Sequence, residues 1–436
     1  MCRKLTKRFS LLSIVLVTTL PALAQTNDPK GENSPYSRFG IGELRNGVNP
    51  MLKGMGSVSS AYANPFAVNT DNPASYGSLK LTTYEGGLEG STRSITSGTQ
   101  QYTTGTATLS HLNVGIPVSK HAGIAFGLRP QSRMFYNLVD TNVIPGFGQG
   151  ITGSFGNGTI NYGFIGAGGK YKGVSLGFNF GYMFGTLTNE HTLKAYNDSV
   201  NVQNSAFRTQ TKIGGIYWNA GAQYETKLSK KLSMRVGGTF TLNQDLTATR
   251  AENWLSVSRI ATTTNSSGNL VYITDTAYSL DKQKSTIALP TSYSFGVQLF
   301  DADKWMVGVD YTSTNWSQFR NFNNTIDSVA SSNYRIALGG EYTPNPKALR
   351  KYFQRVTYRL GFYYGSDYVE LNSKTLNYYA VTGGLSLPFK RTTDRIHLAM
   401  EVGKRGNVTN IIEENFVRFS LGISLNDKWF IKRRYE

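Results

Sequence analysis

The chain has 436 residues, a formal net charge of +18 and one cysteine, which lies at position 2. Tyr, Phe and Trp make up 12% of it, Gly occurs 46 times, and the mean hydropathy is −0.30. A single cysteine excludes a disulfide framework and a Cys-rich zinc site. A basic chain usually raises nucleic acid as a partner. Here many lysines and arginines fall in short turns, as in a rim that faces lipid phosphates, so we expect no nucleic-acid partner.

Residues 1–24 have the pattern of a secretory signal peptide. A basic stretch precedes the apolar run 11–20, and Ala22-Leu23-Ala24 is a small-x-small cleavage site. We expect the mature chain to begin at Gln25 and to reach the outer membrane of a Gram-negative cell. No later stretch has the ~18 uninterrupted apolar residues of a spanning helix. An exported chain of this kind can remain in a membrane only as a barrel.

Residues 78–436 predict an all-β, fourteen-stranded antiparallel transmembrane barrel. Segments such as 417–425 alternate large apolar residues with polar or small ones, which places the two kinds on opposite faces of a strand. Aromatic side chains would face lipid, and Gly, Ser and charges would face the lumen. The expected strands are 78–93, 105–118, 121–133, 157–171, 173–188, 211–228, 231–247, 284–300, 303–317, 331–344, 354–368, 375–388, 394–407 and 414–427.

The predicted connectors alternate in length. The tight set includes 119–121, 171–173, 228–231, 344–346 and 388–395, and the long set includes 134–156, 189–210 and 248–283. Short turns of bacterial barrels face the periplasm and long loops face outward. An even strand count then leaves both chain ends in the periplasm.

The lumen is expected to carry charges of both signs. We expect most of them to form a paired network, because a charge removed from water needs a partner. The candidates are Arg129, Arg235, Arg335, Arg359 and Arg418 with Asp310, Glu341 and Glu401.

Residues 25–77 precede the first expected strand and are rich in Gly, Asn, Pro and Ser. A free periplasmic tail is possible. A lumen of fourteen strands is wide enough to need filling, however, so a compact plug is the simpler interpretation. In the sequence Asn72-Pro73-Ala74, Asn can bond its own backbone, Pro fixes φ, and Ala leaves room for the wall. These three residues are the expected plug turn, and an ordinary turn without a gating role is the alternative.

Several segments resemble the FadL/TodX (OMPP1) family of outer-membrane transporters for long-chain fatty acids and other hydrophobic compounds. The resemblance rests on 52–57 with 61–63, and on 69–75, which look like the family's Gly-rich hatch and its Asn-Pro-Ala turn. Residues 34–40 and 427–432 look like a Bacteroidetes branch of the family. The resemblance implies a fourteen-stranded barrel with an N-terminal hatch, and a kink in the third strand that opens a lateral gap for apolar substrate.

The third expected strand contains Gly127 and Pro130. Proline donates no ladder hydrogen bond and glycine permits a bend, so we expect these residues to mark a lateral opening. The alternative is a proline at the rim, where pairing ends anyway. Arg129 has no Asp or Glu in this expected strand and is the candidate for an anionic head group. Ligand-contacting aromatic and aliphatic candidates follow in the expected apolar loop 134–147, at Phe135, Tyr136 and Leu138. The alternative is a loop that covers the barrel mouth and binds no ligand, and the sequence does not favour either one.

No catalytic site, metal site or cofactor is expected. The histidines are His111, His121, His191 and His397, and no Ser-His-acid set or close His pair can be assembled from their spacing. His397 with Glu401 is expected to be a structural pair.

Two functions remain. The first is passive uptake of hydrophobic small molecules, fatty-acid-like, through a plugged barrel with lateral release. The second is a FadL-like accessory barrel that docks partner proteins, as in a secretion system. The expected partners are membrane lipid and lipopolysaccharide together with a hydrophobic ligand, and the sequence does not specify a protein partner.

Overall fold

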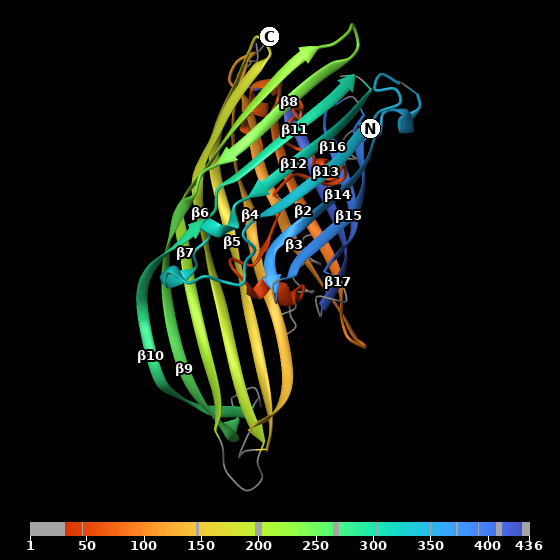
Figure 1. Cartoon of the computed structure of the whole chain (residues 1–436). Coiled ribbons are helices and arrows are strands. Elements are labelled where there is room, and N and C mark those ends of the chain that lie inside the picture. The colour runs from red at the N-terminus through yellow and green to blue at the C-terminus, as the bar shows by residue number, and fades with distance from the viewer. Residues whose placement is uncertain are drawn as a thin grey trace, which may run out of the picture.

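The computed structural model describes residues 31–45, 47–144, 148–196, 203–264, 270–301, 304–348, 350–371, 374–390, 392–406 and 412–429. These residues form a closed antiparallel barrel (Figure 1), and the predicted fourteen-stranded fold is confirmed. The expected signal peptide lies outside the described residues. None of the helices in the described ranges is long and apolar enough to cross a membrane.

The sheet contains seventeen strands: β1 (Glu43–Leu44), β2 (Thr82–Ser97), β3 (Gln100–Pro117), β4 (Ala122–Ile144), β5 (Gly148–Tyr171), β6 (Val174–Tyr196), β7 (Asn204–Lys227), β8 (Ser233–Thr241), β9 (Gln244–Thr264), β10 (Leu270–Leu289), β11 (Ser292–Asp301), β12 (Trp305–Thr314), β13 (Asn333–Tyr342), β14 (Thr357–Leu371), β15 (Lys374–Pro388), β16 (Arg395–Arg405) and β17 (Ile412–Asp427). β1 belongs to the N-terminal segment. β8 and β9 pair in succession with β7, and β11 and β10 pair in succession with β8 and β9. β8 with β9, and β10 with β11, therefore each act as one interrupted strand. Without β1, this leaves fourteen strands in the wall.

The wall closes between its first and last strands. β17 pairs with β2 from Ile412↔Ser97 to Asp427↔Thr82 without a register shift. Side chains alternate across the wall as the sequence predicts. On β6, Leu176 is 61% exposed on the outer face, whereas Ser175 and Asn179 are buried on the lumen face. An outer belt of such apolar side chains is what a lipid-facing barrel requires.

The strands differ greatly in length. β4, β5, β6, β7, β9 and β10 have 20 to 24 residues, whereas β11, β12 and β13 have 10. In Figure 1 the long strands extend past the rest of the barrel at the end drawn lowest. We call this the hairpin end and the opposite one the short-turn end.

At the hairpin end, the prediction of long loops is wrong. Most of 134–156, 189–210 and 248–283 is β-strand, where loops were expected. Beyond the apolar belt both faces of these strands carry Thr, Asn, Ser and Gly, so the alternation disappears from the sequence while the backbone ladder continues. Residues 145–147 of the expected apolar loop lie outside the described residues.

A second correction lies at the short-turn end. The expected tight link at 344–346 and the start of the expected strand 354–368 form one longer connector, 343–356, which contains the 3-10 helix η6 (Tyr352–Gln354). The light-blue connector projects beyond the wall in Figure 1.

The N-terminal segment fills part of the lumen as a plug. It contains the 3-10 helices η2 (Pro35–Arg38) and η3 (Pro73–Ser78), the strand β1 and the short helix α2 (Pro50–Lys53). Tyr36, Met55 and Tyr76 are at most 1% exposed. Glycines of the wall permit close approach of the plug, since a Cβ on Gly339 would lie 2.0 Å from the Met55 carbonyl oxygen.

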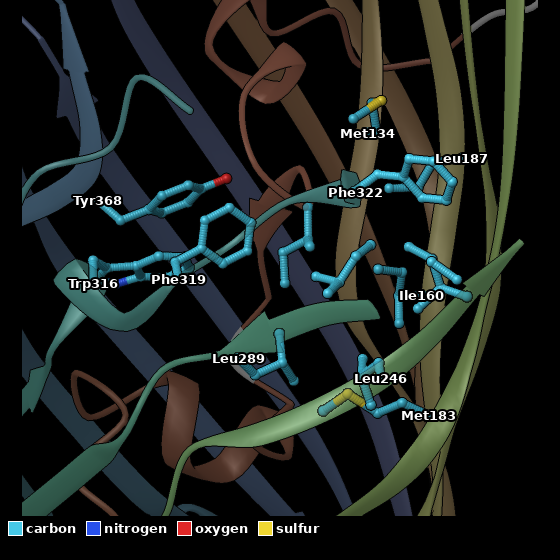
Figure 2. Close-up of a cluster of buried hydrophobic side chains, with 14 of the residues drawn as sticks. Met134, Ile160, Met183, Leu187, Leu246, Leu289, Trp316, Phe319, Phe322 and Tyr368 are labelled. Atoms are coloured by element: carbon cyan, nitrogen blue, oxygen red, sulfur yellow. The ribbon is translucent and has the colours of Figure 1, made fainter. Parts of the chain in front are cut away.

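An apolar cluster fills the lumen toward the hairpin end (Figure 2). The connector 315–332, with 3-10 helices η4 (Trp316–Gln318) and η5 (Phe322–Asn324), carries Trp316, Phe319 and Phe322 into it. Trp316 stacks on Tyr368 with ring centroids 4.1 Å apart. The remaining side chains come from the plug and from the wall strands, including Tyr36, Ile41, Met134, Ile160, Met183, Leu187 and Leu246. This packing covers the lumen at the hairpin end.

Candidate lateral opening and lumen chamber

The ladder between β3 and β4 stops partway along both strands. It runs from Pro117↔Gly123 to Leu112↔Leu128, although β3 continues to Gln100 and β4 to Ile144. Pro130 follows the last pair by two residues, and the ladder of β4 with β5 has a register shift between Pro130 and Ser132. The wall therefore has two separated strand edges from Leu128 toward the hairpin end.

Gly127 has a different role from the expected bend. It is still paired with Asn113, and a Cβ at this position would lie 2.3 Å from the Asn113 side-chain oxygen and 2.6 Å from the Leu112 carbonyl oxygen. Glycine thus allows β3 to approach closely just before the two strands separate.

The plug chain crosses the space between the separated edges. β1 pairs with β4 through Glu43↔Arg133 and Leu44↔Ser132. Farther along, the Ser34 amide donates to the Phe135 carbonyl (3.0 Å), and the Thr104 hydroxyl of β3 donates to the Gly31 carbonyl (2.9 Å). Backbone groups that would lack partners in an open wall are therefore partly satisfied by the plug.

A chamber of about 390 Å³ lies beside the separated edges of β3 and β4. Five basic side chains line it, with two acidic ones: Arg45, Lys53, Arg129, Arg133, Arg418, Glu89 and Glu401. Leu44, Leu109, Leu128 and Pro130 contribute apolar surface. The chamber thus combines excess positive charge with apolar groups at the place where the wall separates.

Arg129 has a partner that the sequence did not reveal. Its guanidinium donates to Asp71 of the plug at 2.7 Å and lies 5.8 Å from the Tyr162 ring centroid. The Asp71 side chain is 31% exposed, and the Arg129 Nε has no hydrogen-bond partner within the described chain. One edge of this guanidinium is therefore neutralised and the other is not.

Arg133 differs from Arg129 in that no carboxylate neutralises it within the described residues. Its Nη2 donates to the Thr106 hydroxyl at 3.2 Å, its buried Nη1 has no partner, and it forms no ion pair with the described residues. Buried guanidinium nitrogens are normally hydrogen-bonded, so an unpartnered Nη1 beside a cavity is a candidate anion contact.

The aromatic and aliphatic candidates lie elsewhere. Phe135 packs against Gly31 and forms an edge-on contact with Phe155 at 5.9 Å. Tyr136 donates to the Asn189 side chain at 2.8 Å, and Leu138 packs against the apolar cluster. In the described structure these side chains contact protein rather than the chamber.

The plug turn is fixed to the wall. The Asn72 side chain accepts from the Ala74 amide at 3.0 Å and caps η3. Its amide nitrogen donates to the Ser60 carbonyl at 2.5 Å and to the Gly238 carbonyl of β8 at 3.3 Å. A Cβ on Gly177 would lie 2.3 Å from Pro73, so this turn sits directly against β6.

A network of ion pairs joins the plug to the wall. Arg93 of β2 is 1% exposed and reaches three carboxylates: Glu32 at 2.9 Å, Glu43 at 2.8 Å and Glu414 at 2.7 Å. Burial alone would raise the pKa of Glu32, but Arg93 and Arg45 outweigh it and lower that pKa to about 2. Nearby arginines likewise hold the pKa of Glu43 well below its ordinary range despite burial. Both plug carboxylates are therefore ionised at neutral pH.

Some predicted lumen charges have the expected kind of partner. Arg418 pairs with Glu401 and Glu43, and Arg359 pairs with Glu341 at 2.8 Å. Arg335 lies on β13 together with Glu341, but its guanidinium donates to the Gly56 carbonyl at 2.7 Å, and Glu341 pairs with Arg359.

His397 does not contact Glu401. Its ring nitrogens lie 2.6 Å from the Ser386 hydroxyl and 2.9 Å from that of Ser424. No group of His, Cys, Asp and Glu suited to a metal ion occurs among the described residues.

The comparison with family models decides the family. The BamG model matches residues 1–436, the whole sequence. The chain belongs to the BamG family. A search of curated proteins found no match for this BamG-family chain.

Solved structures share the fold of this BamG-family barrel at low sequence identity. The Pseudomonas putida toluene transporter TodX is 15% identical, with a TM-score of 0.58 over 89% of this chain and 99% of that one. A Pseudomonas aeruginosa FadL homologue is 12% identical, with a TM-score of 0.57 over 87% and 98%. The Ralstonia pickettii toluene transporter TbuX is 14% identical, with a TM-score of 0.54 over 87% and 98%. The resemblance to FadL/TodX barrels therefore extends to the architecture, while the family that matches is BamG.

Proposed function

We propose that this protein is an outer-membrane barrel that exchanges anionic amphiphiles, fatty-acid-like molecules, between the lumen chamber and the bilayer through the opening between β3 and β4. The observation that carries the proposal is the end of the ladder at Leu112↔Leu128 beside a chamber that contains the unpaired Arg133 guanidinium. A complete ladder would leave no route from lumen to lipid. The short-turn end would face the periplasm of a Gram-negative cell.

The charge of the chamber favours an anionic head group over a bare hydrocarbon. Ion pairing with Asp71 and Glu89 leaves Arg133 as the principal free contact, and Arg129 offers one further donor. The volume of about 390 Å³ lies near the lower limit of the roughly 300–1,000 Å³ common for small-molecule sites. A long alkyl chain would therefore extend past Leu109 and Leu128 toward lipid. The printed names of the similar structures, toluene transporters and a FadL homologue, are compatible with a hydrophobic cargo.

The test compares oleate binding in variants that remain folded. Arg133→Gln should weaken binding by the cost of a charge-assisted hydrogen bond, about 1.5–3 kcal/mol, and Arg129→Ala should have a smaller effect because Asp71 already occupies one edge. Arg208→Gln is the matched control, since that side chain is 51% exposed on β7. Unchanged oleate affinity in Arg133→Gln would remove the head-group assignment.

A separate test addresses the route. Pro130→Val restores a backbone donor on β4 next to the end of the β3–β4 ladder and should slow release of oleate into liposomes without altering its affinity. A normal release rate in Pro130→Val would show that Pro130 does not keep the opening available.

A second candidate is a FadL-like accessory barrel that docks partner proteins. The observation in its favour is the packing of the lumen: the connector 315–332 fills the hairpin end, and the plug chain crosses the lateral opening. An accessory barrel needs no path through its lumen. Wild-type protein that fails to accelerate oleate transfer in liposomes, yet co-purifies with a defined protein after cross-linking in cells, would favour this function over transport. Placement within a Bacteroidetes branch of FadL/TodX-like barrels is part of the same proposal.

A further inference from the structure

The lipid-facing wall over β12–β15 contains a groove. It has a volume of about 690 Å³ and is lined almost entirely by apolar surface, including Val307, Leu338, Leu360 and Phe362. Its floor lies at Gly340. The neighbouring Gly339 faces the plug, because its Cβ would meet the Met55 carbonyl, so Gly340 faces outward.

A second glycine on the lipid-facing side lies next to the groove. Gly384 faces the plug, since a Cβ there would lie 2.9 Å from the Gly54 Cα, so Gly383 faces lipid. Leu360 pairs with both Gly340 and Gly383 and is therefore 69% exposed. The wall thus presents one protruding leucine between two positions without side chains.

The connector 343–356 lies at the short-turn end of the same face. The Asn345 amide donates to the Gln354 carbonyl at 2.8 Å, which closes the connector into a compact loop. The hydroxyl of Tyr358, a groove residue, donates to the Phe353 carbonyl at 3.2 Å. Phe353 is 74% exposed, so an exposed aromatic ring is joined to the rim of the groove.

The same connector carries unneutralised positive charge. Lys347, Arg350 and Lys351 are exposed and form no ion pair with the described residues. The sequence contains no Asp or Glu between Glu341 and Asp367. Basic side chains at a membrane surface attract anionic head groups, and an aromatic ring beside them is typical of the interfacial region.

We propose that this face is a binding site for one anionic phospholipid. An acyl chain lies in the groove over Gly340, and the phosphate is held by the cations of the connector. This site is separate from the chamber and does not depend on the proposed transport. Charge complementarity favours a phospholipid over a neutral lipid, and the attachment of Phe353 to Tyr358 places the loop beside lipid.

The experiment counts bound lipid on the full-length protein. Purified barrel is incubated with phosphatidylglycerol or phosphatidylcholine in mild detergent and examined by native mass spectrometry, with heat-dependent electrophoretic mobility as the check of folding. Wild type should retain one phosphatidylglycerol and release phosphatidylcholine. The variant K347E/R350E/K351E should bind phosphatidylglycerol about a hundredfold more weakly, because each of the three basic residues near an anionic surface contributes roughly a fivefold effect.

Matched controls separate the site from general charge and from general contact with lipid. K227E/K230E/K231E changes three lysines in or next to the turn between β7 and β8, and should bind normally. Val307→Trp places an indole beside Gly340 and should reduce binding, whereas Val402→Trp, equally exposed on β16, should not. Equal retention of both lipids, or unchanged binding in K347E/R350E/K351E, overturns the proposal. A photo-reactive residue at Phe353 that cross-links to a protein instead of lipid also overturns it.

Discussion

Replacement of Arg93 by methionine should loosen the plug while leaving the barrel closed. Methionine approximates the volume of the aliphatic stem but removes the cation from between Glu32, Glu43 and Glu414. Each carboxylate keeps a second cation, since Glu32 still has Arg45 at 3.1 Å. Loss of one member of a buried ion pair costs about 3–5 kcal/mol. Because each of the three carboxylates keeps a second cation, we expect a loss of plug stability in the lower part of that range. Such a loss raises the open fraction of the plug about a hundredfold.

Hydrogen exchange measures this opening directly. Amides of the plug, such as that of Ser34, should exchange about a hundredfold faster in Arg93→Met, whereas amides in the ladder of β5 and β6 should be unchanged. Arg208→Met is the matched control: its pair with Glu190 is exposed and 4.0 Å long, so little change is expected. Plug exchange as slow as in wild type, in a folded Arg93→Met barrel, would refute the view that these ion pairs hold the plug.

Acid should weaken the plug in a defined range. The pKa of Glu32 falls from its ordinary 4.5 to about 2, so its contribution to stability is complete above pH 4.5 and is lost as the pH falls toward 2; urea unfolding at pH 7 and pH 2.5 checks this, and equal stability would contradict it. Trp316→Ala removes the stack on Tyr368 and should cost about 3–5 kcal/mol, measured by chemical denaturation and accompanied by faster proteolysis within 315–332. Gly42→Ala should detach β1 from β4, because φ is +92° and the new Cβ would lie 2.7 Å from the Arg133 carbonyl oxygen. Unchanged exchange of the Arg45 amide, which donates to Gln131, would argue against this reading.

The sequence predicts the part of the fold that meets lipid, because alternation is imposed wherever one face of a strand is apolar. β17, for example, runs 412–427 against an expected 414–427. Alternation ends with the apolar belt, so the portions of β6 and β7 at the hairpin end looked like loops in the sequence. The sequence predicted a set of paired lumen charges but did not assign Arg418 to Glu401. In the structure these two residues pair across neighbouring strands, β17 and β16.

The chamber was less accessible to sequence reasoning. Arg129 looked unpaired because Asp71 is 58 residues away and comes from the plug. Arg133, Glu32 and Glu43 gave no local signal, since a single charge in a strand or an irregular segment has no period. Residues 25–77 contain four acidic and four basic residues, whereas the whole chain has a net charge of +18. This balance was the available indication, because buried acids in a plug require cations in the wall.

The position of Arg93 ties the closing seam of the barrel to the N-terminal segment. Arg93 and Glu414 lie on β2 and β17, the two strands that close the barrel, and are separated by 321 residues in the chain. Two further carboxylates that reach Arg93, those of Glu32 and Glu43, come from the plug rather than from the wall. A charge removed from water needs partners, so the charges at this seam are balanced by both the wall and the plug. The strands that close the barrel and the segment that fills it therefore share one ion-pair network.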